Sequence, residues 1–475
     1  MLLCQAFWRL KRSKGPPPSA FLLLPSAFFN TFILSTMENQ LNQPREYDVV
    51  LGGESLSPRV GDVVLGDIER LLLRGNACFE LGDYQEAINN YTQALQINPK
   101  YSNAYNRRGI CRYQLRDYQG AINDYTQILQ IAPYFAEPYN NRGNAHAQLG
   151  DYQGAIDDYT QALQLNPNYA NAYAGRAATY SDLGDYHRAI NDYTQALQIN
   201  SHKADAYYNN RGNARFALGD KQGAISDYNL ALEINPNFAE IYYNRGIVRH
   251  DLGDYEGAIN DYTQSLQINP NFAQAYYSRG NASCVLGDKH RAINDYNLAL
   301  QINPNYGLAY RNRGDVRSAL GDKQGAINDY NLALQIEPNC AEVYYNRGNA
   351  RITLGDKQGA INDFTQSLQI NPNCAPPYNN RGMIRYDLGD RQGAINDFTQ
   401  VLQIEPDSAP AYNNRGIARS AIGDKYGAIR DLHKAVELFL KQGTIEQYQR
   451  ALSQLTAVES SRLISSARVG IESSP

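Results

Sequence analysis

The sequence predicts an all-α solenoid of about eleven antiparallel helix pairs. Three observations lead to this prediction: a 34-residue spacing between glycines that follow an arginine, two helical apolar stripes within each spacing, and a Leu-Gly-Asp segment between the stripes. A helix pair this short cannot bury its apolar stripe alone, so successive pairs must stack. The usual expectation of about three domains for a chain of 475 residues therefore does not apply.

The third unit illustrates how each element is recognised. In Leu149-Gly150-Asp151, the glycine suits the end of a first helix and the aspartate suits the N-cap of a second one. Ala155 and Tyr159 then recur at helical spacing, which predicts one packed face. Pro167 ends the second helix and turns the chain into the next unit.

These residues resemble the tetratricopeptide repeat (TPR) family. The matches are the period of 34 residues, Gly75 and its equivalents, and Ala87, Tyr91, Ala94 and Pro99 in the first unit. The resemblance implies a right-handed superhelical solenoid with a concave groove lined mostly by the first helices. It also implies a role in binding peptides or proteins.

The residue before the recurrent glycine departs from the family pattern, because arginine stands there instead of a buried leucine. Arg142 and Arg313 are examples. An arginine that faces the interior needs a partner, and the second helices carry aspartates at the same period, such as Asp158 and Asp329. We predict an internal Arg–Asp ladder with charge-assisted bonds. The alternative is an arginine row that grips acidic ligands. The tyrosine three residues before each arginine is predicted to pack in the core.

Asparagines recur immediately before the arginine and immediately after the glycine, on one face of the first helix. We expect this face to turn away from the tyrosine and arginine, onto the concave surface. Amides there can donate to and accept from an extended backbone, and the pattern resembles the asparagine ladder of the TPR superhelix in O-GlcNAc transferase. The alternative is that they are solvated polar residues. The predicted partner-binding residues are Asn141, Asn144, Asn210, Asn213, Asn244, Asn281, Asn312, Asn346, Asn349, Asn380 and Asn414.

Composition limits the kind of partner. The net charge of −4 and the isoelectric point near 5.9 argue against a nucleic-acid or anionic-membrane binder. The lysine and arginine pairs with which heat-shock co-chaperones clamp a chain terminus are absent from the repeat pattern. The expected partner is an internal peptide segment or a folded protein, mildly basic in character. No nucleotide-binding or hydrolase motif occurs, so we predict no catalytic residue, cofactor or metal.

The chain divides into five predicted regions. Residues 1–36 form a doubtful extension or signal-like segment, and translation from Met37 is the preferred reading. A polar linker with a doubled Asp-Val-Val-Leu-Gly follows, then eleven TPR units, a C-terminal capping helix and a disordered tail, at residues 37–67, 68–441, 442–458 and 459–475. We expect no association with a membrane unless residues 1–36 are native.

The predicted function is a protein interaction scaffold. The alternatives are a self-assembling structural solenoid, or an adaptor subunit of a larger enzyme or signalling complex. The cysteines form no CxxC pair, which fits a reducing cytoplasm, with export or anchoring through residues 1–36 as the alternative. Sequence leaves the oligomeric state and the identity of the partner open.

Overall fold

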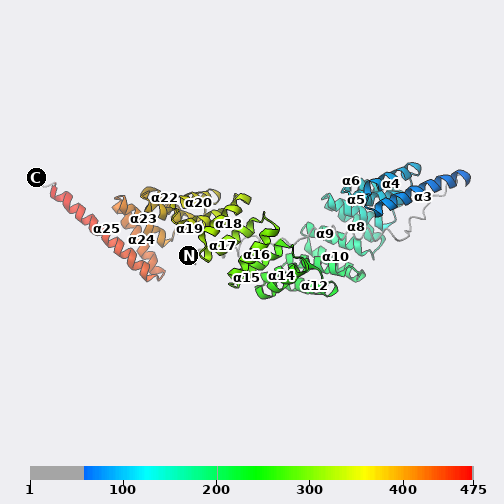
Figure 1. The fold of residues 1–475 in the computed structure, drawn as a ribbon. Helices are drawn as coiled ribbons and strands as arrows, with labels where there is room; N and C mark the ends of the chain where they lie inside the picture. Colours follow the sequence, from blue (N-terminus) through cyan, green and yellow to red (C-terminus); the bar gives the residue numbers. More distant parts are fainter. Residues whose placement is uncertain (1–57, 201, 473–475) are drawn as a thin grey trace. The chain divides into compact units, whose positions relative to one another are not determined.

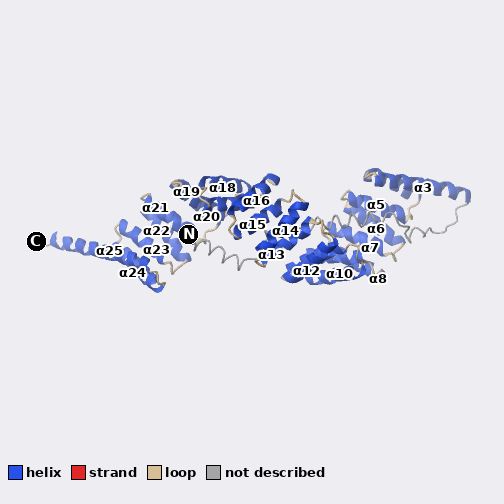
Figure 2. Ribbon diagram, turned by 60° about the horizontal axis from the view of Figure 1, so that its bottom comes forward, coloured by secondary structure: helices blue, strands red, loops and turns tan. Residues whose placement is uncertain are grey.

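The computed structural model describes residues 58–200 and 202–472, and every regular element in these residues is a helix. They run from α3 to α25 in chain order (Figure 1). Figure 2, coloured by secondary structure, shows only helices and loops in the described part of the chain. The predicted all-α class is therefore confirmed.

Within the described residues, the helices alternate as eleven pairs followed by one last helix, α25 (Ile445–Glu472). The first helices of the pairs are Pro58–Glu80 (α3), Ser102–Gln114 (α5), Ala136–Gln148 (α7), Ala170–Asp182 (α9), Ala204–Ala217 (α11), Ala239–Asp251 (α13), Ala273–Val285 (α15), Gly307–Ala319 (α17), Ala341–Thr353 (α19), Ala375–Asp387 (α21) and Ala409–Ala421 (α23). The second helices are Tyr84–Ile97 (α4), Tyr118–Ile131 (α6), Tyr152–Leu165 (α8), Tyr186–Ile199 (α10), Lys221–Ile234 (α12), Tyr255–Ile268 (α14), Lys289–Ile302 (α16), Lys323–Ile336 (α18), Lys357–Ile370 (α20), Arg391–Ile404 (α22) and Lys425–Lys441 (α24).

Residues 58–270 form one compact body and residues 271–472 form another. Inside each body, a first helix packs along its own second helix, and that second helix packs on the first helix of the next pair. Successive first helices also contact one another, as α7 does α9 and α17 does α19, whereas successive second helices contact each other less. We call the side on which successive first helices meet the first-helix face.

The turn between the two helices of a pair follows from its Gly-Asp sequence. Gly150 has φ +78°, a left-handed conformation that costs glycine nothing. The amide of Asp151 then reaches back to the carbonyl of His146 at 3.0 Å, and the Asp151 side chain accepts from the amide of Gly154 at 3.1 Å. In the second pair Arg116 takes the position of the glycine with φ 63°.

The recurrent glycine of the first helix has a packing role. A Cβ atom built on Gly143 would lie 3.0 Å from the ring of Tyr159, and one on Gly75 would lie 2.6 Å from the ring of Tyr91. Both rings are fully buried in the second helix of the pair. The missing side chain therefore lets the two helices approach closely enough to enclose an aromatic ring between them.

Both ends of the helical region differ from the predicted boundaries. Helix α3 begins at Pro58, so residues 58–67, which the sequence assigned to a linker, are helical. Helix α25 continues through Glu472, although a disordered tail was predicted from residue 459. No proline or glycine lies between Gly443 and Gly470, and serine is only mildly unfavourable in a helix. The predictions for residues 1–36 and for the first Asp-Val-Val-Leu-Gly lie outside the described residues.

Candidate functional site

Ten of the eleven recurrent arginines each form a bidentate bond with an aspartate of their own pair. In the third pair, Nε of Arg142 donates to Oδ2 of Asp158 at 2.9 Å, and Nη2 donates to Oδ1 at 2.7 Å. This planar, charge-assisted geometry is the strong form of an arginine–carboxylate pair. The predicted ladder is thus confirmed in ten pairs, and we call its arginines the arginine row: Arg108, Arg142, Arg176, Arg211, Arg245, Arg279, Arg313, Arg347, Arg381 and Arg415.

The third nitrogen of the guanidinium binds the preceding pair. Nη1 of Arg142 donates to the hydroxyl of Thr126 at 3.1 Å, and Nη1 of Arg313 donates to the amide oxygen of Asn297 at 2.6 Å. One arginine therefore joins its own two helices to the second helix before them. Sequence reasoning missed this bond, although its signal is visible: threonine or asparagine stands two residues after the aspartate in nine of the second helices.

The tyrosine three residues before each row arginine lies against the guanidinium. The guanidinium carbon of Arg142 lies 5.6 Å from the ring centroid of Tyr139, and that of Arg313 lies 5.4 Å from the ring centroid of Tyr310. A cation at this distance from an aromatic face is attracted by the ring quadrupole. These tyrosines are half-buried, so they cover the arginine row rather than forming the centre of the core.

A second set of arginines, also missed from sequence, binds the same aspartates. Nη1 of Arg317 lies 2.9 Å from Oδ2 of Asp329, which already holds Arg313. The set lies four residues after the arginine row and comprises Arg112, Arg215, Arg249, Arg317, Arg351, Arg385 and Arg419. Both sets of arginines are paired with aspartates inside the fold. The alternative interpretation, in which the arginine row binds acidic ligands, therefore loses its support.

Several of the predicted asparagines bind one another or a buried tyrosine. Asn281 accepts from the hydroxyl of Tyr296 at 2.7 Å and from Nδ2 of Asn312 at 2.9 Å. The asparagine after the glycine is thus the acceptor, and the asparagine before the next arginine is the donor. Asn380 donates to Asn349 in the same way at 2.9 Å. Bonds of this kind link successive first helices, and we call them the amide ladder.

The expectation that all these amides lie exposed on a concave surface is wrong for three of them. Asn141, Asn144 and Asn244 are 1%, 5% and 1% exposed, because tight packing of neighbouring first helices encloses them. Asn144 and Asn213 accept from Tyr159 and Tyr228 at 2.7 Å. The half-buried members are Asn210, Asn213, Asn281, Asn312, Asn346, Asn349, Asn380 and Asn414.

One pair differs in charge from the others. Asp315 stands where the preceding pair has Asn281, and it accepts from the hydroxyl of Tyr330 at 2.8 Å and from Nδ2 of Asn346 at 2.9 Å. Burial raises the pKa of Asp315 to about 6, against the stabilising hydrogen bond from Tyr330. Nearby, Nη1 of Arg311 lies 3.2 Å from Oε2 of Glu342.

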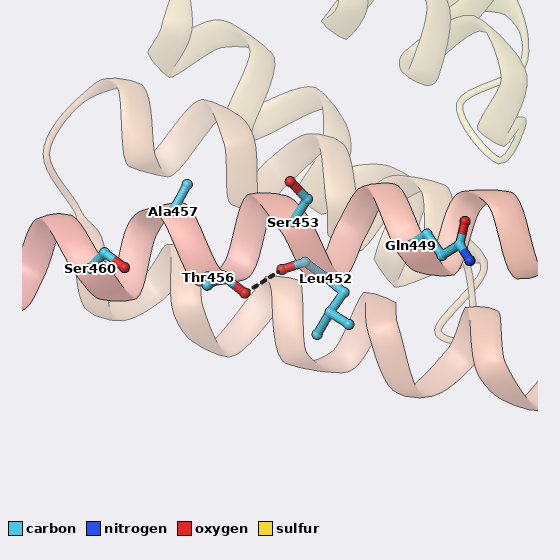
Figure 3. A pocket seen from close by; sticks show the side chains of 6 residues that line it. All are labelled: Gln449, Leu452, Ser453, Thr456, Ala457 and Ser460. Atoms are coloured by element: carbon cyan, nitrogen blue, oxygen red, sulfur yellow. Dashed lines mark hydrogen bonds between the residues drawn. The ribbon is translucent and has the colours of Figure 1, made fainter.

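The remaining surfaces of the described residues were compared for metal-binding clusters, membrane-spanning helices and grooves. Within the described residues, no three histidine, cysteine, aspartate or glutamate side chains are placed to hold a metal ion. None of the described helices is both long and apolar enough to cross a membrane. The sticks in Figure 3 all come from α25, where a shallow groove is lined by Gln449, Leu452, Ser453, Thr456, Ala457 and Ser460.

The stacked helix pairs and their internal ladders define a helical-repeat protein, and comparison with family models identifies the repeat. Models described as tetratricopeptide repeat match residues 102–135, 136–169, 170–203, 273–306, 341–374 and 375–408. A model described as TPR repeat matches residues 75–115, 212–253, 246–283 and 315–355. The matches cover more than half of the chain. The protein therefore belongs to the tetratricopeptide repeat family.

Several solved structures are similar to parts of this chain. A structure of MamA protein is 27% identical over 36% of this chain and 93% of that chain, with a TM-score of 0.34. YrrB, described as a TPR protein with an unusual peptide-binding site, is 24% identical over 39% of this chain and 95% of its own, with a TM-score of 0.35. Yeast Tom70 is 16% identical over 87% of this chain and 100% of its own, at 0.35.

Proposed function

We propose that this TPR scaffold binds an extended peptide or a segment of a folded protein on its first-helix face. The observation that carries the proposal is a difference between two sets of recurrent side chains, the arginines and the asparagines. Every arginine–aspartate pair of the row is bonded internally, whereas eight of the predicted asparagines on the first helices are half-buried. Amide groups that keep contact with solvent can accept and donate bonds to a polypeptide backbone.

The contact residues we propose are the half-buried asparagines. Asn281 and Asn349 each accept through the oxygen, so their Nδ2 donors are available to a backbone carbonyl. Asn312 and Asn380 donate through Nδ2, so their oxygens retain acceptor capacity. The enclosed Asn141, Asn144 and Asn244 are assigned to the joining of repeats instead.

The scaffold role is proposed to be non-catalytic and directed to proteins rather than nucleic acids. A nucleic acid needs a basic surface to neutralise its phosphates, whereas this chain is acidic overall, with a net charge of −4. We place the scaffold in the cytoplasm, because the five cysteines in the described part of the chain, such as Cys111 and Cys340, are free thiols, which fits a reducing compartment. An adaptor subunit of a larger complex is one form that this scaffold role takes.

Affinity capture with quantitative mass spectrometry tests the proposal. The test variant carries Asn281, Asn312 and Asn349 changed to alanine. The matched control carries Gln324, Gln358 and Gln392 changed to alanine, which removes three exposed amides from consecutive second helices. Loss of partners from the first variant alone supports the first-helix face. Identical capture by wild type and both variants, with unchanged thermal unfolding, would refute it.

A further inference from the structure

Outside the arginine–aspartate ladder, one level of the first helices in residues 271–472 carries charges at positions that are neutral in the other pairs of that body. Arg311, Asp315 and Glu342 occupy neighbouring positions on α17 and α19. The same three positions one repeat earlier are Tyr277, Asn281 and Leu308, and one repeat later they are Tyr345, Asn349 and Pro376. Three charges thus replace three neutral side chains at a single level of the stack.

The internal bonds at this level do not require a carboxylate. Asn281 accepts from Tyr296 and Asn312, and Asp315 accepts from Tyr330 and Asn346 with matching distances. An asparagine at position 315 would therefore make the same two bonds through its oxygen. It would also avoid placing a negative charge in a desolvated position, which raises the pKa of Asp315 to about 6. The charge works against folding, and residues of this type concentrate at functional sites.

The arrangement leaves one carboxylate oxygen for a ligand. Both bonds to Asp315 end on Oδ1. Among the described residues no hydrogen bond reaches Oδ2, and Asp315 is half-buried. The side chains of Arg311 and Glu342 keep 16% and 24% of their surface exposed, so a partner can reach this level. Two carboxylates face a single guanidinium, whose Nε is buried without a hydrogen-bond partner. The centre carries a net negative charge.

We propose that Arg311, Asp315 and Glu342 form a recognition centre for a lysine or arginine side chain of the bound polypeptide. The cation lies against Oδ2 of Asp315, with Glu342 as the second acceptor, and the flanking asparagines hold the backbone on either side. This inference rests on the proposed binding of peptides at the first-helix face and adds a charge preference at one position. A partly desolvated charge pair of this kind contributes about 10-fold or more to affinity.

Selection from a phage-displayed library of random 12-residue peptides tests the centre in the full chain. The targets are wild type, Asp315→Asn and Glu337→Gln. Glu337 is exposed at the end of α18, so its variant changes the net charge equally and serves as the control. We expect lysine or arginine at one fixed position in peptides selected by wild type and by Glu337→Gln, and no such enrichment with Asp315→Asn. A selected peptide and its Lys→Gln or Arg→Gln analogue are then compared by fluorescence anisotropy.

The expected result is a loss of about 10-fold in affinity on wild type and of less than about twofold on Asp315→Asn. Peptides selected without a basic preference, or an equal preference on Asp315→Asn, would overturn the charge recognition and leave the scaffold proposal standing. Failure of wild type to enrich any peptide above a variant with Asn281 and Asn349 changed to arginine would overturn both. Unfolding of Asp315→Asn is measured in parallel, and greater stability than wild type at neutral pH is expected.

Discussion

The arginine row and the asparagines beside it recur with the same period, but their surroundings differ. Arg313 donates three hydrogen bonds, two to Asp329 and one to Asn297, and its guanidinium lies over the ring of Tyr310. It therefore binds within and between repeats through second helices. Asn312, its neighbour in sequence, makes contact with the first helix of the preceding pair. Recurrence alone therefore does not separate structural residues from binding residues. The two kinds of residue differ in how much hydrogen-bonding capacity their side chains keep after folding.

The largest expected effect comes from removing an aspartate of the ladder. Asp329→Ala leaves Arg313 and Arg317 without their shared carboxylate, and a buried charge that loses its partner costs about 3–5 kcal/mol. Urea unfolding followed by circular dichroism measures the change. Repeat arrays unfold in parts, so hydrogen exchange in α17 and α18 locates it. A loss below about 1 kcal/mol would show that the bond is not structural.

Asp315→Asn is expected to change stability in the opposite direction. Because the folded state raises the pKa of Asp315 from 3.8 to about 6, folding favours the protonated acid. Stability from this group is present below pH 4 and is lost as pH rises through 6. The variant should therefore be more stable than wild type at pH 7, by as much as about 3 kcal/mol. Unfolding free energies of both proteins across this pH interval should converge at the acid end; parallel curves would contradict the assignment.

The recurrent glycine offers an intermediate effect. Gly314→Ala places a Cβ atom 2.8 Å from the ring of Tyr330, and overpacking of this kind costs about 1–3 kcal/mol. In the background of Tyr330→Ala, the same Gly314→Ala change should cost less, since removal of the ring gives the methyl group room. Thermal unfolding of the three variants gives the coupling. If the single variant is as stable as wild type, the close approach of the two helices is not needed at this pair.

The smallest expected effect concerns the amide ladder. Asn380→Ala removes one neutral hydrogen bond to Asn349, which is worth about 0.5–1.5 kcal/mol. A double-mutant cycle with Asn349→Ala isolates the bond. Little or no coupling would mean that the bond between the two amides does not stabilise the stack of repeats. A structural role for these amides would then be excluded, which favours their assignment to partner binding.

Sequence reasoning reached the repeat, the helix pairs and the Arg142–Asp158 type of contact, because each rests on spacing within about one period. It missed Arg317 as a second ligand of Asp329 and the bond from Arg313 to Asn297. Both contacts join side chains of different helices, so they depend on how those helices pack against one another. It also left α25 too short, because a polar serine-rich composition does not by itself end a helix.

By itself, the sequence determined the number of helix pairs, their turns and the pairing of opposite charges. These follow from local rules: glycine ends a first helix, aspartate caps a second helix, and an inward arginine requires a carboxylate. Only the tertiary structure decided which asparagines remain accessible. Asn144 and Asn281 occupy equivalent positions in the repeat, yet Asn144 is buried and Asn281 is half-buried. The side chains of neighbouring pairs set that difference, and burial is a property of the packed stack rather than of one repeat.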